Sequence, residues 1–423
     1  MNTKLAGILG GALCATTTLV FDAGAAEPAA AGSAGASVQG SADASVNAPA
    51  MPESEPSDRG LELESTMNGA TGLVRTLSAD SGAPGTFRLG VMATYFTGSG
   101  FLCPQCLLPD YSQTTGEDDV SQVAERVLLS VTPLGFLEAY GAVHSQSTSD
   151  SKGASDNPAI RRNFSRNIQV VGNTTLGVKI FTPTAPDRIF SFGGAVDMEM
   201  LASAGSVGIH TANVGIHALG TMDLTRRSNA ASRVPLRLHL NFRYLFDQSG
   251  TLANDIEDSR NQVLGHEQSR ITRVERFSHA INRVDSLRPA LGIEGAFKWV
   301  RPFLEWTIDI PVNRQSHECG GFYKQPDDGC LSQDASFSTI PSRLTIGARA
   351  YPWATPALEG LAILFGVDVG TGATSSFLEE VTPERPWAIH AGLAYAVDTA
   401  GRRPRSPCAA ASPWRSSRTT SWP

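Results

Sequence analysis

The sequence contains little charge and, beyond its first residues, no long apolar run. Asp, Glu, Lys and Arg make up 18% of its 423 residues, below the roughly one quarter that is usual in globular proteins. No apolar stretch after the N-terminus reaches the roughly 20 residues that a membrane-spanning helix needs. The formal net charge of −7 gives no indication of nucleic-acid binding. These absences argue against a helical membrane protein and against a nucleic-acid-binding domain.

The motifs of several enzyme classes are missing as well. The sequence holds no phosphate-binding loop, no HExxH and no GxSxG. We therefore predict neither an enzymatic activity nor a cofactor.

The N-terminal part of the chain does not have the pattern of a folded domain. Residues 1–26 are predicted to be a secretory signal peptide, with Lys4 before an apolar core and small residues at its end. The alternative is an uncleaved membrane anchor. Residues 27–60 are rich in Ala, Gly, Ser and Pro, which predicts a disordered linker. Residues 61–85 are transitional, and 72–85 are interpreted as a short inserted or rim segment.

The clearest pattern is an alternation of apolar and polar side chains over Val234–Asp247. Successive side chains of a β-strand point to opposite faces, so this period of two predicts a strand. Its apolar face carries only Leu, Phe and Tyr, and its polar face carries Arg237, His239, Asn241 and Arg243. A tilted strand of this length can cross a lipid bilayer.

Similar strands recur over residues 86–398, which are predicted to form one closed antiparallel barrel of twelve strands, an all-β fold. The predicted strands are Thr86–Phe96, Gln122–Thr132, Phe136–Ser145, Asn173–Phe181, Phe190–Leu201, Val214–Leu224, Val234–Asp247, Leu287–Phe297, Pro302–Ile310, Arg343–Tyr351, Leu361–Val369 and Trp387–Val397.

The segment 271–282 is ambiguous, because its apolar residues also recur at helical spacing. If it does not span the membrane, short and long connections alternate without exception. Membrane barrels have short periplasmic turns and long external loops in this order. We therefore place 271–282 as a helix or short strand pair within the external loop 248–286.

The pattern resembles Gram-negative outer-membrane β-barrel proteins, the porin-like and outer-membrane-protein-A-like group, over residues 70–398. His390, Gly392, Tyr395 and Val397 match the C-terminal signal of such barrels. The resemblance implies an outer-membrane location, contact with outer-membrane lipid, and recognition by the barrel assembly machinery.

The tail 399–423 is predicted to be disordered. Its Arg, Pro, Ser and Trp bias looks like out-of-frame translation of a GC-rich gene. A natural periplasmic extension would then be missing, which resequencing of the gene would test.

Export to an oxidising compartment favours short-range disulfides. The predicted pairs are Cys103–Cys106 and Cys319–Cys330. Two alternatives are a redox site at the CxxC spacing of the first pair and a zinc site formed by the second pair with His317, Asp327 and Asp328.

The polar faces of the strands predict a lumen lined by charges of both signs. The predicted lining residues are Arg88, Arg126, Lys179, Asp197, Glu199, His217, Asp223, Arg237, His239, Arg243, Glu294, Glu305, Asp309, Arg343, Arg349, Asp368 and His390. One interpretation is a pore lining that sets conductance and selectivity. The other is an ion-pair network that fills the lumen, and a barrel of twelve strands is compatible with both.

Three functions follow from these patterns. The first is a passive, weakly selective channel for small solutes. The second is a structural or adhesive barrel with a plugged lumen and functional external loops. The third is a soluble secreted β-sandwich. A lipid-facing phospholipase site of the kind found in one twelve-stranded class would need a nucleophile beside a base on the outer face, but the outward rows here are apolar.

Overall fold

The computed structural model describes residues 61, 63–103, 117–151, 167–183, 188–202, 209–226, 233–264, 271–315, 317, 319, 328–352 and 358–399. No helix in these ranges is long and apolar enough to cross a membrane.

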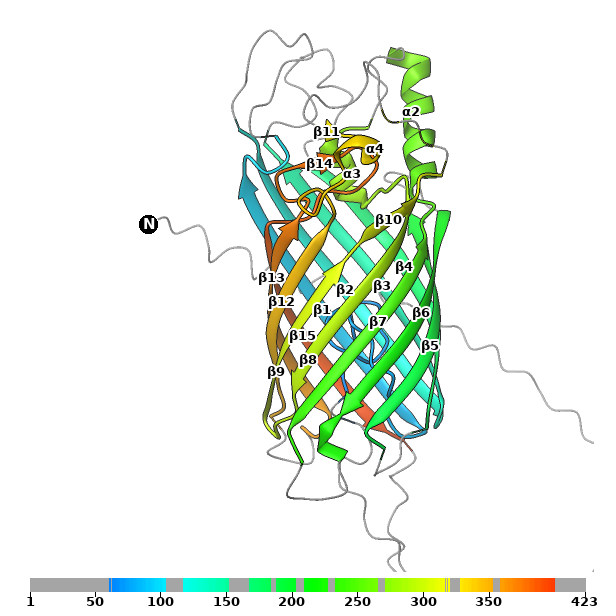
Figure 1. The fold of residues 1–423 in the computed structure, drawn as a ribbon, viewed down its shortest axis with the longest axis vertical. Coiled ribbons are helices and arrows are strands. Elements are labelled where there is room, and N and C mark those ends of the chain that lie inside the picture. Colours follow the sequence, from blue (N-terminus) through cyan, green and yellow to red (C-terminus); the bar gives the residue numbers. More distant parts are fainter. Residues whose placement is uncertain are drawn as a thin grey trace, which may run out of the picture. The chain divides into compact units, whose positions relative to one another are not determined.

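Twelve strands form one continuous antiparallel wall (Figure 1). Its strands are β1 (Thr86–Ser99), β2 (Asp119–Leu134), β3 (Leu137–Asp150), β4 (Asn167–Phe181), β5 (Phe190–Ala202), β6 (Ile209–Asp223), β7 (Leu236–Phe246), β8 (Asp285–Gly295), β9 (Val300–Ile308) with its continuation β10 (Ile310–Asn313), β12 (Ser342–Ala350), β13 (Leu361–Gly372) and β15 (Trp387–Asp398). The β9 and β10 segments are separated only at Asp309 and both pair with β8, so they count as one interrupted strand.

The wall closes where the first and last strands meet. The β1 and β15 strands pair antiparallel from Thr86 opposite Asp398 to Tyr95 opposite Ile389. Closure leaves no unpaired sheet edge within a membrane, where unsatisfied backbone groups are costly. The prediction of a closed twelve-stranded antiparallel barrel is confirmed.

The outward side chains are apolar along the strands. In β1, for example, Phe87, Leu89, Val91 and Tyr95 are exposed, and the residues of the opposite parity, such as Arg88 and Met92, are buried. The same alternation runs through β7, where Leu240 is 46% exposed and the neighbouring Asn241 is buried. The outer surface is therefore suited to lipid, and the inner surface is polar.

Leu240 provides a test of this assignment. It lies near the middle of β7 on the lipid-facing side. We therefore expect Leu240→Arg to make folding into liposomes less favourable by about 2–4 kcal/mol. The matched control is Gln248→Arg, an exposed residue beyond the end of β7, which should cost much less. Equal losses in the two variants would contradict the placement of Leu240 in the membrane.

We call the end with the β2–β3 turn the short-turn end and the opposite end the long-loop end. Short and long connections alternate around the barrel as the sequence predicts, except between β5 and β6, where the connection at the long-loop end is shorter than the neighbouring connection between β6 and β7. Several strands, among them β5 and β6, are longer than predicted, so the β5–β6 connection shrinks to residues 203–208, whereas β7 is shorter than predicted.

The ambiguous loop between β7 and β8 contains two helices rather than a strand. They are α2 (Gly250–Leu264) and α3 (Arg273–His279), and α3 lies at the long-loop end of the barrel (Figure 1). The α3 helix begins with a capping box, in which Thr272 and Glu275 satisfy each other's backbone N–H groups. The prediction of a helix within this loop is confirmed.

Small elements complete the long-loop end. They are β11 (Asp328–Gly329), α4 (Leu331–Asp334) and β14 (Phe377–Leu378), and β11 pairs with β14 in parallel. The short 3-10 helix η3 (Leu224–Arg226) lies at the other end.

One predicted disulfide is confirmed. Cys319 and Cys330 are bonded, with Cα atoms 5.6 Å apart. Cys103 is also disulfide-bonded, and its predicted partner Cys106 lies outside the described residues. No group of three potential metal ligands occurs within the described residues.

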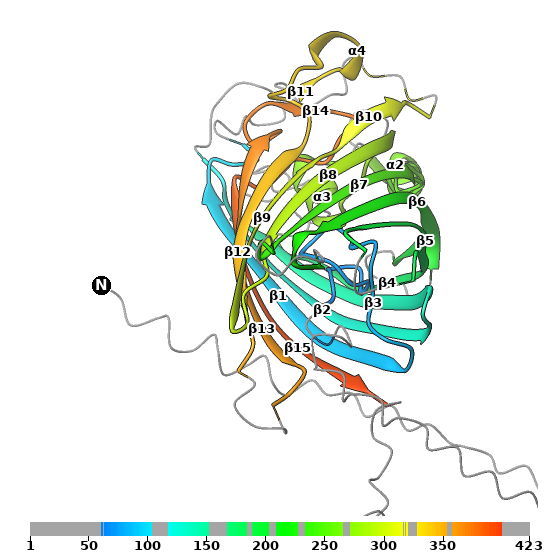
Figure 2. The same cartoon turned by 60° about the horizontal axis from the view of Figure 1, so that its bottom comes forward.

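Residues 63–81 lie inside the barrel. The segment has almost no regular structure, only the isolated bridges Ser65–Thr71 and Gly72–Leu77. Figure 2 shows it, in blue, surrounded by the strands. Most of its side chains are fully buried. Residues 72–85 were interpreted as either an inserted segment or a rim segment, and the structure agrees better with an inserted segment. We call residues 63–81 the inner segment.

Candidate functional site

The inner segment is held by charged side chains of the wall. Glu138 on β3 and Lys179 on β4 form an ion pair of 2.6 Å with no solvent exposure. Both oxygens of Glu138 accept hydrogen bonds from Thr71, one from its backbone N–H at 2.7 Å and one from its hydroxyl at 2.8 Å. Lys179 donates to the carbonyl oxygens of Ser78 and Asp80 at 3.1 and 2.9 Å. One ion pair thus joins two turns of the inner segment to the wall.

A second attachment lies on the opposite part of the wall. Glu305 on β9 accepts hydrogen bonds from the backbone N–H groups of Val74 and Arg75 at 3.0 and 2.8 Å. The Arg75 guanidinium donates to both oxygens of Asp368 on β13, at 3.1 and 2.5 Å, and to Thr345. Asp368 is further bonded to His390 at 2.7 Å. Burial acts to lower the pKa of Arg75, but the neighbouring carboxylates of Asp368 and Glu305 outweigh it and raise the pKa, so this side chain stays charged.

Side-chain amides and hydroxyls act as substitutes for a partner strand. Asn241 on β7 accepts a hydrogen bond from the Leu77 N–H at 2.7 Å and donates one to the Leu77 carbonyl at 2.8 Å. Thr221 on β6 accepts one from the Ala79 N–H at 2.8 Å. An irregular buried segment needs such partners, because buried backbone groups without hydrogen bonds are costly.

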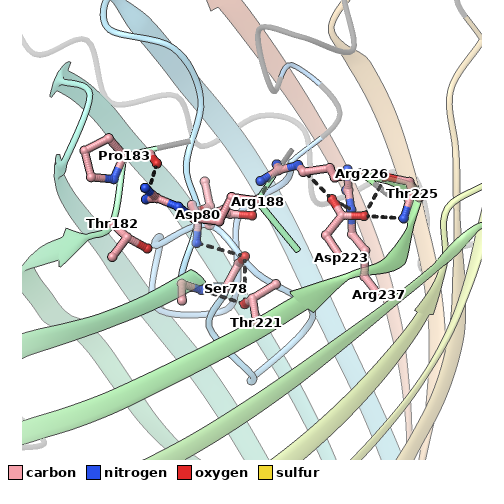
Figure 3. Close-up of polar contacts among 12 residues, drawn as sticks. Ser78, Asp80, Thr182, Pro183, Arg188, Thr221, Asp223, Thr225, Arg226 and Arg237 are labelled. Atoms are coloured by element: carbon pink, nitrogen blue, oxygen red, sulfur yellow. Dashed lines mark hydrogen bonds and ion pairs between the residues drawn. The ribbon is translucent and has the colours of Figure 1, made fainter. Parts of the chain in front are cut away.

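The short-turn end of the segment is joined to η3 and its neighbours (Figure 3). Arg226 lies 3.3 Å from Asp80 and 3.2 Å from Asp223. Asp223 is also paired with Arg237 at 2.9 Å. Two carboxylates and two guanidiniums therefore form one network where the inner segment approaches the turn.

Apolar contacts complete the packing of the inner segment. Leu73 and Val74 belong to a buried cluster with wall residues Met92, Leu128 and Phe303. A second cluster joins Ala70, Leu77 and Ala79 to Tyr140, Ala195 and Leu219. The lumen towards the short-turn end is therefore filled by a packed core.

The long-loop end is closed by a separate cap built on α3. Asp328 accepts hydrogen bonds from Arg273 at 2.7 Å and from Arg276 at 2.6 Å, and all three side chains are buried. Arg276 also donates to the carbonyl oxygen of Leu378 at 3.1 Å. Phe277 on the inner side of α3 packs edge-to-face on Phe96 and Phe101.

Between the inner segment and the cap is a cavity of about 300 Å³. We call it the chamber. Its lining combines residues of both closures with the wall, for example Arg75 of the inner segment and Phe277 of α3. This volume is at the lower end of the range for small-molecule sites.

The chamber lining contains many charged groups, and most of them are paired. The lining holds six arginines and four acidic residues, namely Arg75, Arg126, Arg243, Arg288, Arg343, Arg385, Glu199, Asp247, Asp309 and Glu384. Arg343 pairs with Glu384 at 2.5 Å, and Arg288 approaches Asp309 to 3.5 Å. Arg243 pairs with Asp197 behind the lining at 2.6 Å.

Two arginines of the chamber differ from the rest. Within the described residues, neither Arg126 on β2 nor Arg385 before β15 forms an ion pair. The only hydrogen bond of the Arg126 guanidinium is with Met67 Sδ at 3.5 Å, and the Arg385 guanidinium lies 5.9 Å from the centre of the Phe277 ring. Burial, opposed by Glu384, lowers the pKa of Arg385 to about 10, so it is still a cation at neutral pH.

Comparisons with known proteins identify only distant likenesses. No family model and no curated protein matches the chain. An outer membrane channel from Pseudomonas putida F1 is similar in structure, with 10% identity and a TM-score of 0.41 over 75% of this chain and 98% of that one. The KdgM porin is similar with 9% identity and a TM-score of 0.33 over 72% of this chain and 98% of that one. The CymD monoaromatic hydrocarbon channel is similar with 9% identity and a TM-score of 0.35 over 75% of this chain and 89% of that one.

The closed antiparallel wall, apolar outside and polar inside, decides the class of protein. The chain is a closed β-barrel of the transmembrane type. Such a surface is stable only in lipid, because large exposed apolar areas are rare on soluble proteins. This excludes the soluble β-sandwich.

Sequence reasoning and the structure agree on which face of the barrel carries the charges. The predicted lining residues in contact with the inner segment are Arg88, Arg126, Lys179, Glu305 and Asp368, and Arg88 donates to the Leu63 carbonyl at 2.6 Å. Those in the chamber lining are Arg126, Glu199, His217, Arg243, Asp309 and Arg343.

The remaining predicted residues mostly contact one another within the wall. Asp197 lies 2.6 Å from His217, and Glu294 lies 3.8 Å from His239. Arg349 stacks over Phe303. Most of this polar row is therefore an ion-pair network.

Sequence reasoning missed Glu138, although the alternation along β3 gives it the same parity as Tyr140 and Ala142. The β2–β3 register places Glu138 on the same side as the buried Tyr140 and Ala142. Arg75 was missed because the inner segment has no periodic pattern.

Proposed function

We propose that this barrel is a gated outer-membrane channel for small solutes, in which the inner segment is the gate. The chamber is the observation that carries the proposal, since a purely structural barrel has no need of a polar cavity inside its lumen. Solute passes between the chamber and the short-turn end when the inner segment moves.

The contacts of the inner segment are suited to such a movement. They include ion pairs and hydrogen bonds from wall side chains, such as Asn241 to Leu77, beside the apolar packing of Leu73 and Val74. Within the described residues, the segment is joined covalently to the wall only where the chain continues into β1. Polar groups that lose these partners can be rehydrated when water enters the lumen, which lowers the cost of opening.

A disulfide across the gate tests the proposal. A Cβ atom on Gly292 of β8 would lie 3.6 Å from Leu73 Cγ, so Leu73→Cys with Gly292→Cys places two sulfur atoms within bonding reach. In planar bilayers we expect small intermittent conductance steps from the wild type, none from the oxidised double variant, and their return on reduction. Leu73→Cys alone and the wild type, each with the same reductant, control for the native disulfides.

Two outcomes would contradict the gate. Wild-type conductance from the oxidised double variant would mean that solute does not pass the inner segment. Absence of conductance from the wild type and the reduced variant would favour the second candidate, a structural or adhesive barrel. The closure of both ends of the lumen is the observation that favours that candidate.

We also propose that β15 is recognised by the barrel assembly machinery. Tyr395 and Val397 share the parity of the lipid-facing Leu393, whereas His390 is buried in the lumen. This arrangement leaves an aromatic and an apolar side chain outward for recognition. Tyr395→Ser should reduce assembly in the outer membrane while leaving refolding into liposomes nearly unchanged, which separates recognition from stability.

A further inference from the structure

The two unpaired arginines of the chamber point to the class of solute. Arg126 and Arg385 come from opposite sides of the closure between β1 and β15, and their charges repel one another and that of Arg75. Guanidinium groups without a carboxylate are costly in a confined lumen. A site with like charges gathered beside a cavity gains stability when an anion enters it.

We infer that the chamber binds the carboxylate of a small organic anion between Arg126 and Arg385. This inference rests on the proposed function and names the substrate class of the channel. The planar fork of a guanidinium matches the two oxygens of a carboxylate and can bind them in pairs.

The remaining lining fits an organic anion better than an inorganic one. A volume of about 300 Å³ is about that of ten water molecules and exceeds the needs of a single small ion. Phe277 beside Arg385, with Leu245 and Val381 in the lining, offers apolar contact to a short carbon chain.

The acidic groups of the lining leave these two arginines available. Glu384 is bound to Arg343, and Asp309 lies between Arg288 and Arg343. Asp247 accepts hydrogen bonds from Ser249 and Asn282 instead of a guanidinium.

Glu199 is the acidic residue that acts most strongly on Arg126, as Glu384 does on Arg385. It attracts Arg126 electrostatically but is not within ion-pair distance of it among the described contacts. Its position requires that an entering carboxylate bind on the Arg385 side of Arg126, away from Glu199. Glu199→Gln is therefore expected to tighten binding rather than weaken it.

Glutarate and 1,5-diaminopentane are the probes, because they have the same chain length and opposite charge. Full-length protein in detergent is incubated with each probe to equilibrium, and binding is followed by calorimetry and by the rise in melting temperature that a ligand of the folded state produces. We expect glutarate to bind and the diamine not to bind. Loss of one charge-assisted contact in Arg126→Gln or Arg385→Gln should weaken glutarate binding about tenfold or more.

Arg188→Gln is the matched control, since Arg188 is exposed in the β4–β5 turn and its loss should leave binding unchanged. Preference for the diamine, or equal glutarate affinity in all variants, would overturn the inference. If glutarate binds but the wild type never conducts, the proposal of a channel is refuted and the proposal of an anion site is supported. If the engineered disulfide blocks conductance reversibly but glutarate does not bind, the proposal of a channel is supported and the proposal of an anion site is refuted.

Discussion

Replacement of Lys179 by methionine is expected to lower the free energy of unfolding by about 3–5 kcal/mol, the usual cost of removing one partner of a buried ion pair. Methionine nearly preserves the volume of the side chain but leaves Glu138 charged in a site without water. The carbonyl oxygens of Ser78 and Asp80 lose their donor at the same time. Denaturant unfolding of the protein in detergent, followed by tryptophan fluorescence, measures the loss.

Two further variants show whether the ion pair is the cause. Lys298→Met removes an exposed lysine at the β8–β9 turn and should change stability by less than about 0.5 kcal/mol. Adding Glu138→Gln to Lys179→Met should recover part of the loss, because the unpaired charge is then gone. If Lys179→Met and Lys298→Met were equally mild, the inner segment would not be anchored through this pair.

Replacement of Asp328 by alanine is expected to release the cap at the long-loop end. Asp328 is the shared partner of Arg273 and Arg276, so its removal leaves two buried guanidiniums without a carboxylate. The loss of stability should again be about 3–5 kcal/mol. It should weaken the docking of α3 and leave the wall of the barrel stable. Limited proteolysis should then cut in or near α3 while the β-sheet circular dichroism signal of the barrel is retained.

Asp255→Ala is the control for this experiment. Asp255 is an exposed residue of the loop helix α2, and its replacement should leave both proteolysis and stability close to the wild type. A cap that resists protease equally in Asp328→Ala and Asp255→Ala would show that the apolar packing of Phe277 alone is sufficient to hold α3.

The wall of the barrel was predictable because its pattern is local. Each strand shows its own alternation, and Leu240 and Asn241 reveal their faces from their neighbours alone. The strand number came from connection lengths, which a closed membrane barrel restricts to an alternating order. Strand ends were less accurate, since the strands continue beyond the membrane into residues with weaker alternation, such as Asp119 and Asp150.

The inner segment and the chamber were not predictable in the same way. The partners of Arg75 and Val74 are Glu305 and Asp368, more than two hundred residues away in the sequence. The segment gains its conformation from these contacts rather than from a helical or strand period, so no local pattern marks it. Equal numbers of acidic and basic residues on the wall were compatible with a wet pore and with a filled lumen, and only the distances between them decide.

The continuity of the inner segment with β1 has a consequence for the order of assembly. The inner segment is followed after a few residues by β1, whose pairing with β15 is the seam that closes the barrel. In an empty barrel, Glu305 would lose its hydrogen bonds from Val74 and Arg75, and Glu138 would lose those from Thr71. We therefore expect the sheet to curl around the inner segment before the seam forms. The segment would then act as an internal template that is present at biogenesis and is loosened later for transport.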